Sequence, residues 1–88
     1  MKKPILYVKQ GCPWCIDALE YFNKIGISLE VIDVTKHRDY MQELIDCSDQ
    51  SKTPTLKNDN FVVADFDIDE FKQAMSENPI EAKKLGFK

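Results

Sequence analysis

The sequence predicts one small α/β domain that spans residues 1–88. Short apolar runs rich in strand-forming residues alternate along the chain with stretches whose apolar residues recur at helical spacing. No linker, internal repeat or low-complexity segment interrupts them, and the length is that of one domain. The predicted order is strand, helix, strand, helix, two strands and then one or two helices.

The composition excludes several classes of function. The 12 Lys and Arg against 15 Asp and Glu give a formal net charge of −3, which offers no electrostatic footprint for nucleic acid. No apolar run approaches the roughly 20 residues of a membrane-spanning helix, and no secretory signal is recognisable. The chain has three cysteines, an odd number, and Cys12 and Cys15 are too close in sequence to staple a fold, which argues against a secreted disulfide scaffold. We therefore expect a cytoplasmic protein with no membrane or nucleic-acid partner.

The first strand and the first helix have the clearest signals. Residues 5–8 form an apolar run ended by Gly11, which permits a sharp turn. Pro13 suits the first turn of a helix, and Gly26 suits the position just after its end. Apolar residues at helical spacing fill the interval: Cys15, Ala18, Leu19, Phe22 and Ile25.

A second strand and a second helix are expected next. Residues 27–31 alternate in polarity and lead into Ile32-Asp33-Val34, so 27–34 is predicted as a strand with one face more buried than the other. Thr35 is the expected N-cap of the helix, and the polar residues 48–51 end it. The apolar stripe of this helix comprises His37, Tyr40, Met41, Leu44 and Ile45.

The last third of the chain predicts a hairpin followed by helices. Residues 53–56 and 61–64 are prone to form strands and flank the turn-forming residues 57–60. The stretch 67–70 matches a capping box that opens a third helix. The stretch 78–81 repeats that signal for a short terminal helix ending near Gly86. The inward stripe of the third helix is Ile68, Phe71 and Met75.

The reactive chemistry is predicted at Cys12, which lies between a strand and the start of a helix. Unpaired backbone N–H groups and the positive end of the helix dipole stabilise a thiolate there. Cys15 follows one helical turn later, so it can attack a mixed disulfide formed on Cys12 and release the product. Cys12 is the predicted nucleophile and Cys15 the resolving thiol. Lys9 either adds positive potential or is a solvated surface charge.

The combination of these motifs resembles a glutaredoxin of the thioredoxin fold. The resemblance rests on the segment Lys9–Cys15 after the first strand, on Thr53-Pro54 entering the hairpin, and on Phe66-Asp67 opening a helix. It implies a four-stranded mixed sheet of order βαβαββα flanked by helices. It also implies a thiol-disulfide oxidoreductase that reduces protein disulfides or glutathione mixed disulfides.

The resemblance also implies roles for individual residues. Pro54 would be a cis proline beside the two thiols, and the backbone of Thr53 would pair with the cysteine part of glutathione or a peptide. Lys9 would meet the glycine carboxylate of glutathione, while Phe66 and Asp67 would hold its γ-glutamyl end. Glutathione would be a cosubstrate, with no cofactor bound permanently. Disulfide-containing proteins would be the other partners of a monomeric enzyme.

Three departures from the family pattern concern the same region. Ala64-Asp65 stands where the family usually has two glycines, and Ile16-Asp17 follows Cys15 where a basic residue is common. Trp14 replaces the more usual tyrosine and either forms an aromatic lip for the substrate or covers apolar surface.

These departures leave two alternatives open. One is a hydrogen donor that thioredoxin reductase reduces and that lacks glutathione binding; the other is an iron–sulfur cluster-binding glutaredoxin. A third class is an adaptor that only binds partners. Two further residues receive no catalytic role: Cys47 is expected to be an idle thiol and His37 a packing or capping residue. A zinc site that combines them with Cys12 and Cys15 lacks the usual closely spaced ligand pairs, so no metal is expected.

Overall fold

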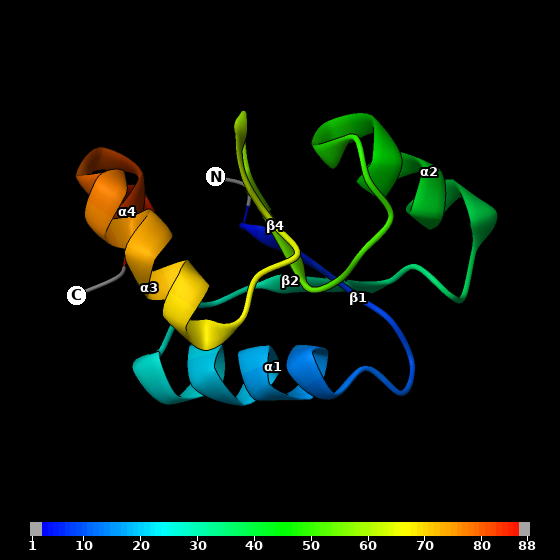
Figure 1. The fold of residues 1–88 in the computed structure, drawn as a ribbon, viewed down its shortest axis with the longest axis horizontal. Helices are drawn as coiled ribbons and strands as arrows, with labels where there is room; N and C mark the ends of the chain where they lie inside the picture. The colour runs from blue at the N-terminus through cyan, green and yellow to red at the C-terminus, as the bar shows by residue number, and fades with distance from the viewer. Residues whose placement is uncertain (1–2, 87–88) are drawn as a thin grey trace.

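The computed structural model describes residues 3–86 and has the predicted mixed α/β architecture (Figure 1). The four-stranded sheet has the order β2-β1-β3-β4, in which β1 pairs parallel to β2 and antiparallel to β3, and β3 pairs antiparallel to β4. Two helices follow the last strand, in place of the one in the βαβαββα order. The elements are β1 (Ile5–Val8), α1 (Pro13–Ile25), β2 (Glu30–Asp33), α2 (Arg38–Ser48), β3 (Thr55–Asn58), β4 (Phe61–Ala64), α3 (Ile68–Glu77) and α4 (Pro79–Leu85).

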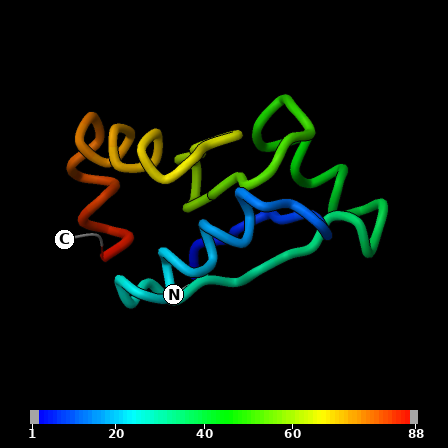
Figure 2. The backbone as a smooth tube through the Cα atoms, turned by 60° about the horizontal axis from the view of Figure 1, so that its bottom comes forward, coloured from blue at the N-terminus to red at the C-terminus, as the bar shows by residue number. Residues whose placement is uncertain are grey.

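Helices cover both faces of the sheet. Successive side chains of β1 point to opposite faces, so this strand contributes to the apolar cluster on each side. Leu6 and Val8 belong to a large apolar cluster that contains residues of α1, α3 and α4. Tyr7 belongs to a smaller cluster with Leu44 of α2 on the other face. Figure 1 shows α1 running beneath the sheet, and Figure 2 shows α2 at the opposite end of the molecule from α3 and α4.

The second strand and the start of the second helix differ from the prediction. β2 occupies only residues 30–33 of the expected 27–34. Thr35 is not the N-cap of α2: its hydroxyl and its backbone N–H both donate to the Asp33 carboxylate and hold the chain in a turn. The helix begins three residues later at Arg38, with His37 in the N-cap position. The His37 side chain makes no capping hydrogen bond, and its ring lies 5.5 Å from that of Tyr40.

The hairpin and the third helix follow the prediction more closely. β3 extends through Lys57 and Asn58, which shortens the expected four-residue turn to two residues. Asp67 and Glu70 form the predicted capping box, in which each carboxylate accepts the backbone N–H of the other residue (2.7 and 3.0 Å). Asn78 does not cap α4 with its side chain, which instead donates to the carbonyl of Ala74 (2.9 Å).

Aromatic side chains from α1 and α3 fill the larger cluster beneath the thiols. The ring centroids of Phe22 and Phe71 are 4.8 Å apart, and Phe66 lies 5.4 Å from Phe71 and 6.2 Å from Phe22, in tilted or edge-to-face geometry. This packing fixes α3 against α1 and therefore fixes the loop that precedes α3 relative to Cys12. No helix within residues 3–86 has the length and apolar character to cross a bilayer.

Replacing Phe22 with alanine tests this dependence. We expect Phe22→Ala to lower the free energy of unfolding by about 3–5 kcal/mol, because it removes a buried ring that packs near three others and leaves a cavity. Urea denaturation followed by circular dichroism measures the change. Ile80→Ala, at a position that is 73% exposed in α4, is the control and should stay within about 0.5 kcal/mol of the wild type. Equal losses in the two variants would contradict the assigned core.

Candidate active site

The Cys12 sulfur occupies the N-cap of α1 and replaces the oxygen that usually caps a helix. Gly11, with φ of +74°, turns the chain out of β1, and Pro13 takes the first helical position, where no N–H is required. The Cys12 Sγ then accepts the backbone N–H of Cys15 at 3.2 Å. A negative sulfur is stabilised in this position by the unpaired N–H groups and by the helix dipole.

A second set of contacts reaches Cys12 from a segment 41 residues away in sequence. The antiparallel pairing of β1 with β3 brings the loop before β3 beside the loop after β1. The Thr53–Pro54 peptide bond is cis, as the resemblance predicts. The Cys12 Sγ lies 3.9 Å from the Thr53 carbonyl oxygen and 3.8 Å from the Thr53 hydroxyl, which donates to it.

Gln50 holds the loop that carries Thr53, and the sequence analysis did not identify it. Its side-chain amide donates to the hydroxyls of Thr55 (3.1 Å) and Ser48 (2.8 Å), and its side-chain carbonyl accepts the backbone N–H of Lys52 (2.6 Å). The fully buried Thr55 hydroxyl in turn donates to the carbonyl of Lys52 (2.9 Å). The polar composition of residues 48–51 predicted a loop but not this network.

The surroundings of Cys12 favour its ionised form. Burial of the side chain favours the neutral thiol, but hydrogen bonds from Cys15, from the Thr53 hydroxyl and from the Trp14 backbone favour the thiolate. Together they hold the pKa of Cys12 below the ordinary value for a thiol. Cys12 is half-buried, so this sulfur remains accessible to a substrate.

Cys15 has the opposite properties. Only 2% of its surface is exposed, and it belongs to the apolar cluster beneath the site. This burial, together with its hydrogen bond to Cys12, raises the pKa of Cys15, although the Thr53 hydroxyl and the Lys9 backbone oppose the shift. The two thiols are therefore unequal: one is accessible and prone to ionise, and the other is enclosed and held neutral. This inequality is what an attacking and a resolving thiol require.

Four of the residues predicted to bind a substrate line one cavity of about 280 Å³. Trp14, which is 59% exposed, lines its mouth, and the exposure is consistent with an aromatic lip. Pro54 is buried beside it, and its carbonyl accepts the backbone N–H of Phe66 at 3.4 Å. The lining residues are Trp14, Thr53, Asp65, Phe66, Asp67 and Glu70.

Three of the predicted residues have features that the sequence did not specify. The Phe66 side chain is only 3% exposed and packs in the core, so the part of this residue that can meet a ligand is its backbone. The Asp67 carboxylate lines the cavity and caps α3 at the same time. Lys9 is half-buried at the end of β1 and is not among the residues that line the cavity.

Asp65 is a site residue whose geometry the sequence did not reveal. Its φ of +52° lies in the left-handed region, which glycine adopts most easily. An aspartate in this conformation, where the family pattern has a glycine, adds a carboxylate to the cavity. The Asp65 carboxylate pairs with the Lys52 ammonium at 3.8 Å.

Cys47 lies apart from the two thiols, with the cluster on the other face of the sheet. Its thiol donates to the Leu44 carbonyl (3.4 Å). Burial raises the pKa of Tyr7 to about 12, and the neighbouring Cys47 and Glu43 add to the shift. This placement does not bring Cys47 into a metal site with Cys12 and Cys15, and residues 3–86 contain no group of three or more His, Cys, Asp or Glu side chains suited to a metal.

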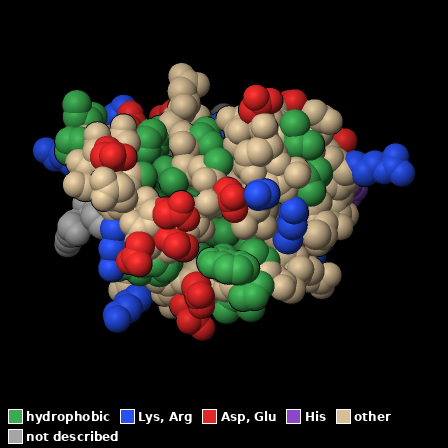
Figure 3. Space-filling model, viewed as in Figure 1, with side chains coloured by type: hydrophobic (Ala, Val, Ile, Leu, Met, Phe, Trp, Pro, Cys, Tyr) green, Lys and Arg blue, Asp and Glu red, His purple; other side chains and the backbone are tan. Residues whose placement is uncertain are grey.

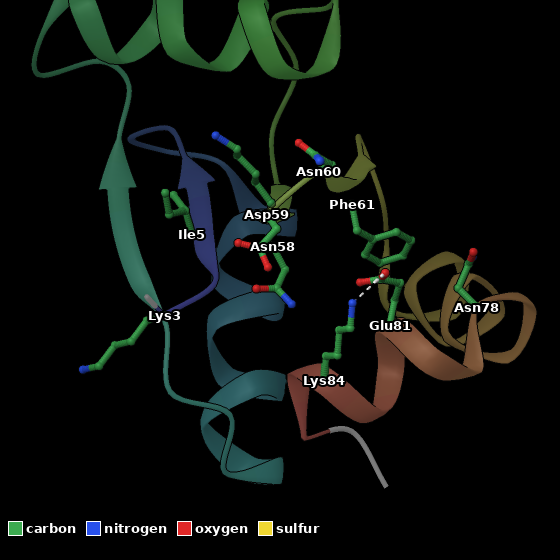
Figure 4. Close-up of a pocket in the computed structure, with 10 residues that line it drawn as sticks. Lys3, Ile5, Asn58, Asp59, Asn60, Phe61, Asn78, Glu81 and Lys84 are labelled. Atoms are coloured by element: carbon green, nitrogen blue, oxygen red, sulfur yellow. Dashed lines mark ion pairs between the residues drawn. The ribbon is translucent and has the colours of Figure 1, made fainter. Parts of the chain in front are cut away.

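A larger cavity, of about 830 Å³, lies between the tip of the hairpin and α4 (Figure 4). Lysine, asparagine and acidic side chains line it, and Lys84 pairs there with Glu81 at 3.6 Å. No cysteine lines this cavity, so it takes no part in thiol chemistry.

Comparisons with known proteins agree with this geometry. The glutaredoxin family model matches residues 5–63, which include both thiols and Thr53-Pro54. A thioredoxin-like protein of known crystal structure is 31% identical, with a TM-score of 0.72, over 81% of this chain and 97% of its own. The glutaredoxin of Archaeoglobus fulgidus is 20% identical, with a TM-score of 0.72, over 83% of this chain and 85% of its own.

A more distant match is buckwheat glutaredoxin, solved as a complex with glutathione. It is 14% identical to this chain, with a TM-score of 0.69, over 94% of this chain and 76% of its own. No curated protein sequence matches the chain significantly.

Removing the Thr53 hydroxyl tests its effect on the Cys12 thiolate. We expect Thr53→Val to raise the pKa of Cys12, because a hydrogen bond to the charged form is lost. Alkylation of Cys12 by iodoacetamide at neutral pH should slow by about three- to ten-fold, since a pKa unit changes the thiolate fraction ten-fold. Mass spectrometry of the peptide that contains Cys12 measures the rate. Thr53→Ser keeps the hydroxyl and should retain most of the rate; equal slowing in both variants would contradict this role.

Replacing Gln50 tests the support of the loop. We expect Gln50→Ala to destabilise the protein by about 1–3 kcal/mol, because buried hydrogen-bond partners such as the Thr55 hydroxyl lose a partner. It should also slow the alkylation of Cys12, because Thr53 is no longer held beside the sulfur. Gln42→Ala is the matched control, since this glutamine makes only an exposed hydrogen bond to Asp46 in α2. Unchanged Cys12 reactivity in Gln50→Ala would show that the loop positions itself without this network.

Proposed function

We propose, from the premise that this chain belongs to the glutaredoxin family of thiol-disulfide oxidoreductases, that glutathione is its cosubstrate. The proposed substrates are protein disulfides and mixed disulfides of proteins with glutathione. The observation that carries the proposal is the accessible Cys12 sulfur, held as a helix cap beside Thr53 and next to the cavity under Trp14.

The reaction begins with attack by the Cys12 thiolate on one sulfur of the substrate disulfide. A mixed disulfide forms, and the other substrate sulfur leaves as a thiolate and takes up a proton. Cys15 then loses its proton and attacks the Cys12 sulfur, which releases the second substrate thiol. The substrate gains two electrons, and the protein is left with a Cys12–Cys15 disulfide. Loss of the Cys15 proton is easier at this stage, because Cys12 no longer competes as a neighbouring thiolate.

Glutathione would return the protein to its dithiol form from the same cavity. The Thr53 backbone lies beside the Cys12 sulfur, where an extended cysteine residue of glutathione would pair with it. The Asp67 carboxylate at the start of α3 would accept the α-ammonium group, and the backbone of Phe66 would line the same end. Lys9 would approach the glycine carboxylate by extending from the end of β1. A related fold was solved with glutathione in the buckwheat protein.

The proposed setting is the cytoplasm, where thiols are kept reduced by glutathione and thioredoxin systems, and the proposed state is a monomer. Asp65 favours a second candidate, reduction by thioredoxin reductase, because its carboxylate lies in the cavity where the anionic glutathione would bind.

The direct test measures disulfide reduction coupled to NADPH with two electron donors in parallel. We expect turnover with glutathione and glutathione reductase to exceed turnover with thioredoxin reductase alone. Turnover with thioredoxin reductase only would reject glutathione as the cosubstrate and leave the thiol-disulfide chemistry intact. An absorption band of an iron–sulfur cluster in anaerobically purified protein would reveal the cluster-binding alternative.

Cysteine variants assayed in the same way test the roles of the two thiols. Cys12→Ser should abolish exchange, with a loss of at least about a thousand-fold, because an alcohol is not a nucleophile towards disulfides at neutral pH. Cys15→Ser should keep part of the activity towards glutathionylated substrates, since glutathione itself can release the product from Cys12. Cys47→Ser is the matched control and should be unchanged, given that its thiol lies with the other face of the sheet. Equal loss in the Cys12 and Cys15 variants would contradict the glutathione-linked route.

A further inference from the structure

The walls of the cavity beside Cys12 carry negative charge. Asp65, Asp67 and Glu70 line it, and no lysine or arginine does. On the other side of Trp14 a second hollow of about 230 Å³ is lined by two further aspartates, at positions 17 and 69. Figure 3 shows Asp and Glu side chains gathered over the start of α3, next to a hydrophobic patch. A substrate that reaches Cys12 must therefore bring part of its chain beside several carboxylates.

Asp65 differs from the other two carboxylates of the cavity. Those of Asp67 and Glu70 accept backbone N–H groups in the capping box and lie at the positive end of α3, which offsets part of their charge. The Asp65 carboxylate instead pairs with Lys52 at 3.8 Å, and the two side chains are 52% and 73% exposed. Such an exposed pair is weak and is screened by solvent and salt. The Asp65 carboxylate is thus the one most available to a substrate.

The backbone holds Asp65 in a defined place relative to the thiols. The next residue, Phe66, is anchored twice: its N–H donates to the carbonyl of Pro54, and its ring packs in the core. Asp65 therefore directly precedes the residue whose N–H binds Pro54, in the segment that contacts Cys12. Its side chain lines the same cavity as Thr53, which is 3.8 Å from the reactive sulfur.

We propose that Asp65 is a specificity-determining residue that favours peptide disulfides flanked by basic residues over those flanked by acidic residues. A lysine or arginine one or two residues from the substrate cysteine would replace Lys52 as the partner of Asp65. A carboxylate in the same place would be repelled by Asp65 and by its two acidic neighbours. This inference rests on the proposed thiol-disulfide exchange and concerns the choice of substrate for it.

The test compares two disulfide-bonded peptides that differ only in a lysine or a glutamate two residues from the cysteine. The protein is reduced beforehand and freed of reductant, so its own dithiol supplies the two electrons and the identity of the cellular donor does not matter. Single-turnover rates are followed by mass spectrometry of the peptide thiols. Each rate is divided by the rate with dithiothreitol, an uncharged dithiol, which removes the intrinsic difference in reactivity between the peptides.

We expect the wild type to prefer the lysine peptide by about ten-fold at low salt, and this preference should fall as salt is added. Asp65→Asn should reduce the preference by about three-fold or more, because it removes one carboxylate and keeps a side chain that tolerates positive φ. Lys52→Gln should increase the preference, because it frees the Asp65 carboxylate.

The matched control is Asp59→Asn, which makes the same substitution at another residue with positive φ (+54°), in the hairpin turn away from the cavity beside Cys12. Its preference should equal that of the wild type. Equal wild-type rates on the two peptides, or the same preference in Asp65→Asn as in the control, would overturn the role of Asp65 while leaving the exchange reaction in place. A wild type that reduces neither peptide would instead overturn the proposed function.

Discussion

The hydrogen bond from the Cys15 backbone N–H to the Cys12 sulfur is the contact on which the rest of the site depends. The reactive sulfur is therefore part of the secondary structure, since the atom that attacks a disulfide also caps the N-terminus of α1. The direction of α1 then places Cys15 one turn further on, where the helix packs against β1 and β3. One helix terminus therefore produces both the accessible thiolate and its enclosed partner. Hydrogen bonds to Cys12 lower its pKa and burial raises that of Cys15, without a nearby cation.

The second half of the site comes from tertiary structure. Thr53 reaches Cys12 because β3 pairs with β1, and its position is held by the side chain of Gln50 and the buried hydroxyl of Thr55. The aromatic packing of Phe66 attaches the start of α3 to the same place. Each wall of the cavity is thus fixed by a different kind of interaction: a helix cap, a polar network in a loop and an apolar anchor. The surface that the substrate contacts is therefore held in place by three separate sets of interactions.

The sequence predicted those parts whose signals are local. The strand at residues 5–8 was predicted to the residue. The first helix was predicted with Pro13 in its first turn and Gly26 just past its end, and both residues lie at these limits. The N-cap at Thr35 was wrong because the Asp33 carboxylate engages both the hydroxyl and the N–H of Thr35. Helical periodicity does not reveal such a local contact. The nearness of Thr53 to Cys12 came only from the resemblance to glutaredoxins. The Gln50 network and the left-handed backbone of Asp65 were not predictable, since both depend on where distant segments lie after folding.

Cys12 and Thr53 are 41 positions apart in the sequence, and this separation affects the reactivity of Cys12 during synthesis of the chain. A nascent chain that has emerged only as far as α2 lacks the strand that delivers the Thr53 hydroxyl, and an unfolded chain also lacks the helix terminus that stabilises the sulfur. In the unfolded chain the thiols have ordinary acidity and are largely protonated at neutral pH, whereas the partly emerged chain lacks only the contribution of Thr53. The Cys12 thiol is therefore less reactive towards oxidants before folding, and folding itself generates the reactive thiolate.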